Sequence, residues 1–208
     1  MPALIAFEGT DGSGKQTQCD LLVKRLEKEG HAVKDFAFPD YDSPYGQLVK
    51  KYLSGGFPGI TPHQAALLYA LDRFQKKDEL LEAKRMSVVV CDRYIHSNAA
   101  YQSAKLPTPE KRREFANWLL FVESVLPQPD CVIFLNLDPV VCAKLLEERG
   151  EKDDHEKELA YQQAVRKTYL ELADDSWIIV DCAAGGELRS KKEIHEEIHF
   201  ALKKRKII

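Results

Sequence analysis

A glycine-rich segment near the N-terminus constrains the fold of this chain more than any other feature of its sequence. Residues 9–15 read Gly-Thr-Asp-Gly-Ser-Gly-Lys and stand between an apolar run at residues 4–7 and a stretch with helical periodicity. In that setting, successive backbone N–H groups can point at a polyphosphate, and the helix N-terminus adds partial positive charge. The segment therefore predicts a phosphate-binding P-loop whose lysine contacts the β- and γ-phosphates.

One position of this loop departs from the usual pattern. The residue after the lysine, usually a Ser or Thr that contacts Mg²⁺, is Gln16, and Thr17 follows about 100° further round the helix. This arrangement weakens the case for direct ligation of a metal by a hydroxyl. The residues predicted to bind the phosphate donor are Gly9, Thr10, Asp11, Gly12, Ser13, Gly14, Lys15, Gln16 and Thr17.

Short apolar runs rich in Val, Ile and Phe recur along the chain. They lie at residues 4–7, 33–38, 88–91, 131–137 and 177–180, and longer stretches with helical periodicity separate them. Because most of these runs are continuously apolar, both faces of the sheet should be covered, as in parallel sheets with crossover helices. We expect an α/β fold: a three-layer sandwich with a five-stranded parallel sheet covered by helices, of the P-loop NTPase type.

The helical stretches have readable ends, and one break between them is unusually polar. Helices are expected at residues 15–29, 62–85, 110–125, 140–148 and 158–172. Residues 149–157 contain no large apolar side chain, so burial in a core cannot hold them in place. The segment is either a mobile lid, which we place at 149–157, or a solvated helix hairpin.

Length and composition exclude several classes of protein. A chain of 208 residues, 44% hydrophobic and 30% charged, suits one globular domain, which we place at residues 1–208. Its 33 acidic and 30 basic side chains leave a net charge of −3, so no global positive field can hold a nucleic acid. Five cysteines without a CxxC pair favour a reducing cytoplasm. The sequence has no apolar stretch of roughly 18 residues, so we expect no membrane insertion.

An acidic and a basic residue follow the apolar run at 88–91. Asp92 stands where the strand should end, at the carboxyl edge of the sheet beside the P-loop, where ligands of open α/β folds collect. There it can hold Mg²⁺ through water, or it can serve as a helix cap. Arg93 should lie at the same edge, where its guanidinium can meet phosphate oxygens.

Taken together, these motifs resemble those of the thymidylate kinase family, a branch of the P-loop nucleoside monophosphate kinases. The resemblance rests on the P-loop with Asp11, on Phe-Pro-Asp-Tyr at 38–41, Leu-Asp-Arg at 71–73, Asp-Arg-Tyr at 92–94 and Ser-Asn-Ala-Ala-Tyr at 97–101. It implies a cytoplasmic, Mg²⁺-dependent kinase that transfers phosphate from ATP to dTMP and forms dTDP for dTTP biosynthesis. It also implies a homodimer, for which the apolar residues 118–122 can supply either an interface or core.

The resemblance also assigns residues to the acceptor nucleotide. Arg73 matches the arginine that grips the acceptor phosphate, and Tyr69 matches an aromatic that stacks on thymine, although its spacing equally suits a core stripe with Leu67, Leu68 and Leu71. Asn98 matches a residue that reads the pyrimidine, and Tyr101 one that disfavours a 2′-hydroxyl. The full set implied for the substrate is Asp11, Phe38, Pro39, Tyr69, Arg73, Arg93, Asn98, Tyr101 and Gln102. Asp11 is the residue matched to the 3′-hydroxyl.

Phosphoryl transfer to a nucleotide phosphate depends on charge and positioning more than on proton removal. The acceptor phosphate has a second pKa near 6 and is mostly a dianion at neutral pH, so it requires no base. Cations must offset the repulsion between the phosphates, and we assign this to Lys15, Arg73, Arg93, Mg²⁺ and a mobile cation from the lid. Because no basic residue stands at positions 10–13, the catalytic lid cations should be Arg149 and Lys152.

Two other functions stay open from the residues alone. One is a kinase of the same fold with another acceptor, such as a deoxynucleoside or a different monophosphate. The other is a regulatory protein that binds ATP and hydrolyses it slowly or not at all. The arginine pair favours an acceptor that already carries a phosphate, and a regulatory protein would not need a second pocket lined by Phe38, Tyr69, Asn98 and Tyr101.

Overall fold

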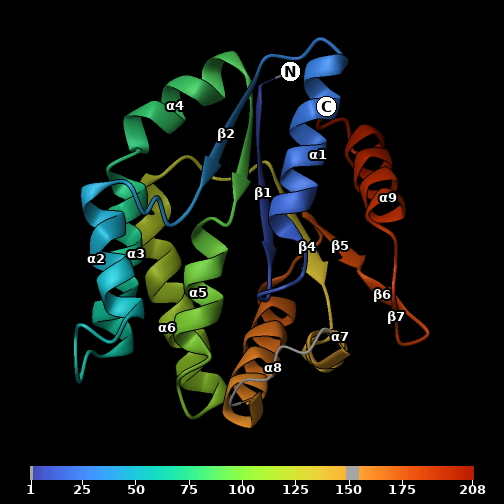
Figure 1. The fold of residues 1–208 in the computed structure, drawn as a ribbon. Coiled ribbons are helices and arrows are strands. Elements are labelled where there is room, and N and C mark those ends of the chain that lie inside the picture. The colour runs from blue at the N-terminus through green and yellow to red at the C-terminus, as the bar shows by residue number, and fades with distance from the viewer. Residues whose placement is uncertain (1, 149–154) are drawn as a thin grey trace.

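The computed structural model describes residues 2–148 and 155–208. A central sheet lies between helices, and the strands run downward in Figure 1 from the side on which the N-terminus lies. In chain order the elements are β1 (Ala3–Gly9), α1 (Lys15–Lys28), β2 (Val33–Ala37), α2 (Pro44–Leu53), α3 (Pro62–Phe74), α4 (Lys77–Met86), β3 (Val88–Asp92), α5 (Ile95–Ser103), α6 (Pro109–Val122), a 3₁₀ turn (Glu123–Val125), β4 (Cys131–Asn136), α7 (Pro139–Glu148), α8 (His155–Leu172), β5 (Trp177–Asp181), β6 (Ala183–Ala184), β7 (Glu187–Leu188) and α9 (Lys191–Lys204).

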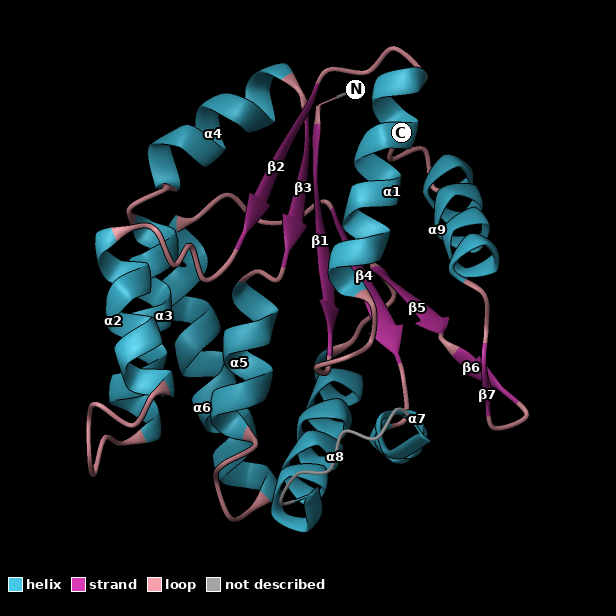
Figure 2. Ribbon diagram, viewed as in Figure 1, coloured by secondary structure: helices cyan, strands magenta, loops and turns pink. Residues whose placement is uncertain are grey.

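The sheet has the five strands that the apolar runs predict. Its order is β2-β3-β1-β4-β5, and every neighbouring pair is parallel. Parallel neighbours need crossover connections, which the helices supply. The predicted α/β fold with a five-stranded parallel sheet is confirmed, and Figure 2 shows the strands enclosed by helices.

Buried side chains form clusters on both faces of the sheet. On one face, Leu22 of α1 and Ile198 of α9 pack against β1 residues such as Ile5. On the other face, Leu80 of α4 packs against β1 and β3, while Val165 of α8 packs against β4 and β5. This covering of both faces explains why the strands read as continuous apolar runs.

The predicted helix at 62–85 is wrong in its length, because the chain forms two helices there. Helix α3 ends at Phe74, and α4 begins at Lys77. At the junction the side-chain amide of Gln75 donates to the carbonyl of Asp72 at 3.0 Å, so a side chain satisfies a group that the helix leaves open. The break redirects the chain, so that α4 buries Leu80 on the sheet while α3 packs against α2 and α5.

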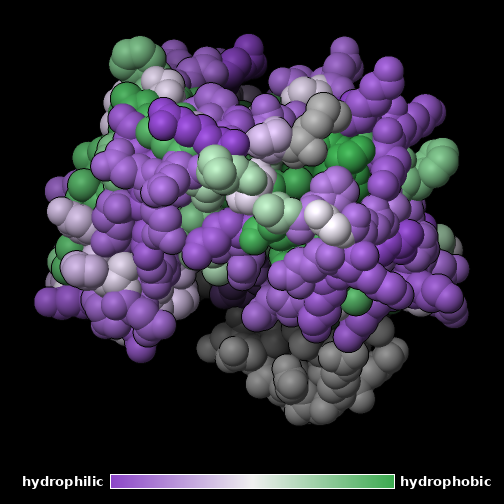
Figure 3. Space-filling model, turned by 90° about the horizontal axis from the view of Figure 1, so that it is seen from above, coloured by the Kyte–Doolittle hydropathy of each residue, from purple (hydrophilic) through white to green (hydrophobic). Residues whose placement is uncertain are grey.

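The two edges of the sheet, at the amino and the carboxyl ends of its strands, differ in what lies there. Hydrophilic side chains cover most of the face at the amino ends of the strands, which is the view from above in Figure 3. The glycine-rich loop lies at the opposite, carboxyl edge, where it connects β1 to α1. Within the described part of the chain, no helix has the length and apolar composition needed to cross a membrane.

Candidate active site

The glycine-rich loop takes its shape from backbone angles that favour glycine. Gly12 and Gly14 have φ angles of 75° and 87°, in the left-handed region. A Cβ atom at Gly12 would also lie 2.6 Å from the Sγ atom of Cys142, so the loop passes close to α7. Gly14 stands at the N-cap of α1 and carries no side chain that could occupy the first amide groups of the helix. These amides are therefore available to an anion.

Lys15 lies inside this loop. Its side chain is 7% exposed, and its Nζ donates to the carbonyl of Thr10 at 2.8 Å and lies 3.5 Å from Ser13 Oγ. Burial lowers the pKa of Lys15 to about 8, and repulsion from Arg93 adds to that effect. A phosphate oxygen would supply the negative charge that the buried ammonium lacks.

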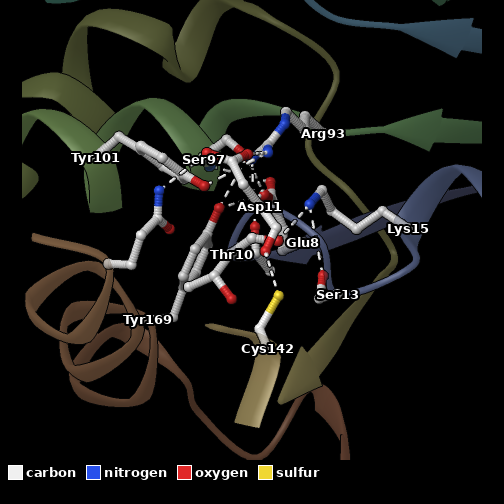
Figure 4. A network of polar contacts seen from close by, with 12 residues as sticks. Glu8, Thr10, Asp11, Ser13, Lys15, Arg93, Ser97, Tyr101, Cys142 and Tyr169 are labelled. Atoms are coloured by element: carbon white, nitrogen blue, oxygen red, sulfur yellow. Dashed lines mark hydrogen bonds and ion pairs between the residues drawn. The ribbon is translucent and has the colours of Figure 1, made fainter. Parts of the chain in front are cut away.

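A buried carboxylate lies directly beneath the loop (Figure 4). Glu8, at the end of β1, is 0% exposed and accepts hydrogen bonds from the backbone N–H groups of Tyr94 and Ser97 at 3.0 and 3.1 Å. The hydroxyls of Ser97 and Tyr169 also donate to it, the latter at 3.0 Å. Burial raises the pKa of Glu8, and these hydrogen bonds with the charge of Arg93 oppose the rise. Glu8 thus fixes the start of α5 against β1.

Arg93 adopts a backbone conformation that is uncommon for a residue with a side chain. Its φ is 64°, which turns the guanidinium toward the glycine-rich loop. Nη1 donates to Gly9 O at 3.2 Å, Nη2 pairs with Asp11, and the guanidinium lies 5.0 Å from the ring centre of Tyr101. Burial alone would lower the pKa of Arg93, but neighbouring oxygens, above all those of Tyr101, Tyr169 and Asp11, raise it. Arg93 therefore stays charged.

Asp92 has one carboxylate oxygen to spare. Its Oδ1 is shielded from solvent and has no hydrogen-bond partner among the described residues. Burial raises the pKa of Asp92, while Lys15 and Arg93 oppose the rise. Across residues 2–148 and 155–208, no three His, Cys, Asp or Glu side chains gather into a ready metal cage. The spare oxygen fits a water held by a cation better than it fits one ligand of a closed protein cage.

A cavity of about 420 Å³, which we call the central cavity, opens beside the glycine-rich loop. Side chains from the loops after β2 and β3, and from α2, α3, α5, the turn after α5 and α8, line it together with the glycine-rich loop itself. It brings together all the residues that the sequence assigned to the acceptor, namely Asp11, Phe38, Pro39, Tyr69, Arg73, Arg93, Asn98, Tyr101 and Gln102. Other side chains that line it are Tyr41, Tyr52, Leu53, Ser97, Lys105, Glu158, Tyr161 and Gln162.

One residue of the cavity's lining, Arg73, belongs to a buried ion pair. Arg73 is 2% exposed and donates from Nε and Nη2 to the two oxygens of Glu123, at 2.8 and 2.6 Å. Asn98 Nδ2 donates to the same carboxylate at 2.7 Å. Burial alone would lower the pKa of Arg73, but Glu123 raises it. Arg73 and Asn98, which the resemblance assigned to the acceptor's phosphate and base, are thus joined through one carboxylate.

Aromatic side chains surround the rest of the cavity. Tyr69 is half-buried and meets the ring of Tyr52 edge-on, with ring centres 6.1 Å apart. The core positions of α3 are Ala65, Ala66 and Ala70, whereas Leu67 and Leu71 are 41% and 37% exposed. The alternative of a core stripe containing Tyr69 is therefore wrong.

Helix α8 contacts the site at both Tyr101 and Asp11. The hydroxyl of Tyr161 donates to the carbonyl of Tyr101 at 2.7 Å, and Gln162 Nε2 donates to Asp11 Oδ2 at 3.0 Å. The predicted lid at 149–157 joins this helix: residues 149–154, with Arg149 and Lys152, lie outside the described residues, and α8 begins at His155.

Several residues at this site escaped the sequence reasoning, among them Glu8, Glu123 and Gln162. Two of them carry a signal in hindsight, because Glu8 interrupts the apolar run before the loop, and Glu123 interrupts the apolar stretch Phe-Val-Glu-Ser-Val at 121–125. A charged residue inside an apolar run is either at a surface or paired. Gln162 has no such signal, since it stands in a polar part of α8.

Fold and site together define a class: a P-loop protein of α/β type, with a phosphate loop at the carboxyl edge of the sheet and a cavity adjoining it. The family model described as thymidylate kinase matches residues 7–198. A thymidylate kinase of Danio rerio is 33% identical over 94% of this chain and 87% of its own length. A probable thymidylate kinase of Pyrococcus abyssi is 33% identical over 93% of this chain and 92% of its own length. The chain belongs to the thymidylate kinase family.

A solved structure shows the same likeness in three dimensions. The thymidylate kinase of Candida albicans superposes with a TM-score of 0.77 at 28% sequence identity. The match covers 98% of this chain and 92% of that one. The P-loop type of the fold, predicted from residues 9–15, is confirmed.

Proposed function

We propose that this chain transfers the γ-phosphate of ATP to dTMP, giving dTDP and ADP, with the central cavity as the acceptor site. One observation carries the proposal: the residues that resemblance assigned to an acceptor nucleotide come from separate elements and all line a single cavity beside the phosphate loop. Membership of the thymidylate kinase family supports the proposal as well.

The glycine-rich loop is the proposed donor site. Residues 9–17 hold the phosphates through the open amides at the start of α1, and Lys15 meets the β- and γ-phosphates. Mg²⁺ neutralises phosphate charge when it is bound. Of the described residues, Asp92 suits that ion through water, because its Oδ1 has no partner among them and its carboxylate is near enough to Lys15 to interact with the ammonium. Gln16 is exposed on the first turn of α1, and Thr17 beside it is half-buried.

Arg93 and Asp11 lie where the proposed donor and acceptor sites meet. Asp11 belongs to the loop and also lines the central cavity, and Arg93 pairs with it. An acceptor phosphate there approaches the donor phosphates against like-charge repulsion, which the guanidinium of Arg93 offsets. The carboxylate of Asp11 can then accept a hydrogen bond from the 3′-hydroxyl of the acceptor. Gln162, which donates to Asp11 Oδ2, holds that carboxylate in place. The acceptor dianion attacks directly, so no side chain needs to remove a proton.

The remaining cation comes, in this proposal, from a lid at residues 149–157 within one catalytic domain, 1–208. Positions 10–13 carry no basic residue, which leaves the loop short of charge for the transition state. Arg149 and Lys152 supply it when the lid closes over bound ATP. Helix α8 follows this segment directly in the chain and contacts Asp11 and Tyr101. The same helix therefore connects the proposed lid to the cavity.

A coupled assay tests the acceptor directly. Purified chain with ATP and Mg²⁺ is given dTMP, dUMP, UMP, CMP, AMP or thymidine, and ADP formation is followed. We expect the highest kcat/KM for dTMP and no turnover of thymidine, which lacks the phosphate. Highest activity with another nucleotide would assign a different acceptor, and ATP hydrolysis that no acceptor stimulates would place the chain among slow ATPases.

We further propose a homodimer in the cytoplasm. Helices α3 and α6 meet through His63 and Phe115, with ring centres 4.6 Å apart, and both present apolar side chains to solvent. The exposed ones are Leu67 and Leu71 on α3 and Phe121 on α6, and Val125 in the 3₁₀ turn after α6 is exposed as well; Phe121 is 77% exposed. Exposed apolar side chains on two neighbouring helices favour a second copy of the chain. Sedimentation should give a dimer for the parent and a monomer for Phe121→Asp.

The proposed cytoplasmic location is supported by free cysteines. Those at Cys19, Cys91, Cys131 and Cys182 are buried and carry reduced thiols.

A further inference from the structure

Glu123 is completely buried and contacts two side chains that line the central cavity, Arg73 and Asn98. It is 0% exposed, its Oε1 accepts from both Arg73 and Asn98, and its Oε2 accepts from Arg73. A buried ion pair often contributes little to stability, because the cost of removing both charges from water offsets their attraction. The arrangement therefore calls for a functional reason.

The amide of Asn98 has only one orientation in these surroundings. Its Nδ2 donates to Glu123 Oε1 at 2.7 Å and to the backbone carbonyl of Ala66 at 2.9 Å. A carboxylate and a carbonyl accept hydrogen bonds and donate none. If the amide turned by 180°, its own oxygen would face two acceptors. Glu123 and Ala66 thus determine which end of the amide stays available.

The available end is the carbonyl oxygen of Asn98. This Oδ1 is shielded from solvent and has no hydrogen-bond partner among the residues described. The side chain is 3% exposed and lines the central cavity. A buried acceptor without a donor is costly, and a ligand that brings an N–H group to it removes that cost.

We propose that Glu123 sets the base selectivity of the central cavity, by holding Asn98 Oδ1 as an acceptor for the imide N–H of a thymine or uracil nucleotide. This inference rests on the proposed use of the cavity as the acceptor site. Cytosine carries a lone pair, not a hydrogen, at the same ring nitrogen, so two acceptors would face each other. Glu123 contacts Asn98 and Arg73 and acts as a positioning residue.

Direct binding to the parent tests the hydrogen bond itself. Calorimetry with dTMP, dUMP, dCMP and a dTMP analogue methylated at N3 should show that the first two bind at least roughly tenfold more tightly than the last two, which offer Oδ1 no hydrogen. Proton NMR of bound dTMP should show an imino proton that exchanges with water more slowly than in free dTMP. Equal affinity for the N3-methyl analogue, or unslowed exchange, overturns the inference.

Two variants test the role of Glu123. Glu123→Gln can present an N–H₂ group to Asn98 and so permits its amide to turn; the dTMP-to-dCMP ratio of kcat/KM should fall roughly tenfold. Glu123→Asp keeps an obligate acceptor and should retain most of the preference. ATP binding by each variant reports whether it is folded. If Glu123→Gln does not fold, the NMR measurement on the parent still tests the hydrogen bond of Asn98 on which the role of Glu123 depends, and unslowed exchange there overturns that role.

The outcomes separate this inference from the proposed function. A parent that phosphorylates no thymidine nucleotide contradicts the proposed function. A parent that phosphorylates dTMP, with a folded Glu123→Gln variant whose dTMP-to-dCMP ratio is unchanged, contradicts the role of Glu123 alone.

Discussion

The phosphate loop and the central cavity lie next to each other, but they are built differently. The loop is one continuous segment between β1 and α1, and its geometry comes from glycine angles and helix amides. The cavity is an assembly of side chains from α2, α3, α5 and α8 with the loops after β2 and β3. Backbone geometry suits a phosphate, which every nucleotide carries, whereas assembled side chains can distinguish one base or sugar from another.

The largest expected effect belongs to the loop. Lys15→Ala removes the ammonium that meets the donor phosphates and should lower kcat by roughly a thousandfold or more, with the fold intact. Lys24→Ala, on the exposed side of the same helix, is the matched control and should keep parental kcat. Steady-state kinetics with unfolding curves for both variants measure this. Near-parental kcat in Lys15→Ala would contradict the donor site assigned to the loop.

The same contrast explains how far the sequence predicts the molecule. The strands and the loop follow from short contiguous patterns, apolar runs and a glycine-rich turn, whose physics is local. The break between α3 and α4 has no Gly or Pro to announce it, since it arises where Gln75 satisfies Asp72 and Leu80 reaches the sheet. The cavity's residue types were recognisable by resemblance, but their partners were not. Glu123 is 50 positions from Arg73, and Gln162 is 151 positions from Asp11.

The second prediction concerns the proposed lid, which would add a mobile cation to the rigid loop. Arg149→Ala should lower kcat by one to a few orders of magnitude, on the scale of other supplied arginines, with a smaller effect on the Kd of dTMP. Lys152→Ala should have the lesser effect, because an ammonium cannot bridge two phosphate oxygens as a guanidinium does. Single-turnover kinetics and direct dTMP binding measure both. An unchanged single-turnover rate in Arg149→Ala would transfer the role to Lys152 or Arg93.

The third prediction tests the selectivity of the cavity. Tyr101 lies beside Arg93, with 3.4 Å between its hydroxyl and Nη2, and meets Tyr161 and Tyr169 edge-on. Tyr101→Ala should narrow the preference for dTMP over its ribose counterpart by roughly tenfold, because the steric wall is lost. Tyr101→Phe is the control that keeps most of the wall. Equal discrimination by the alanine variant would make Tyr101 a packing residue.

The smallest effect follows from the pKa of Lys15, about 8 in the structure without nucleotide. Bound phosphate favours the charged ammonium, so the pKa of Lys15 rises on binding and ATP binding takes up a proton above pH 8. The Kd for ATP should therefore be flat below about pH 7 and rise roughly fourfold between pH 7.0 and 8.5, with Mg²⁺ saturating. Calorimetry in buffers of different ionisation enthalpy measures the number of protons taken up when ATP binds. Release of a proton on binding would contradict the assigned contact between Lys15 and the phosphates of ATP.

The central claim is that two nucleotide sites meet at Arg93 and Asp11. The most direct test is calorimetry with a ligand that joins adenosine and thymidine through five phosphates, long enough to place each nucleoside in its own site. We expect one molecule per chain, affinity at least about a hundredfold above that of either mononucleotide, and displacement by both ATP and dTMP. Displacement by only one of them, with affinity no better than that nucleotide's own, would contradict the account.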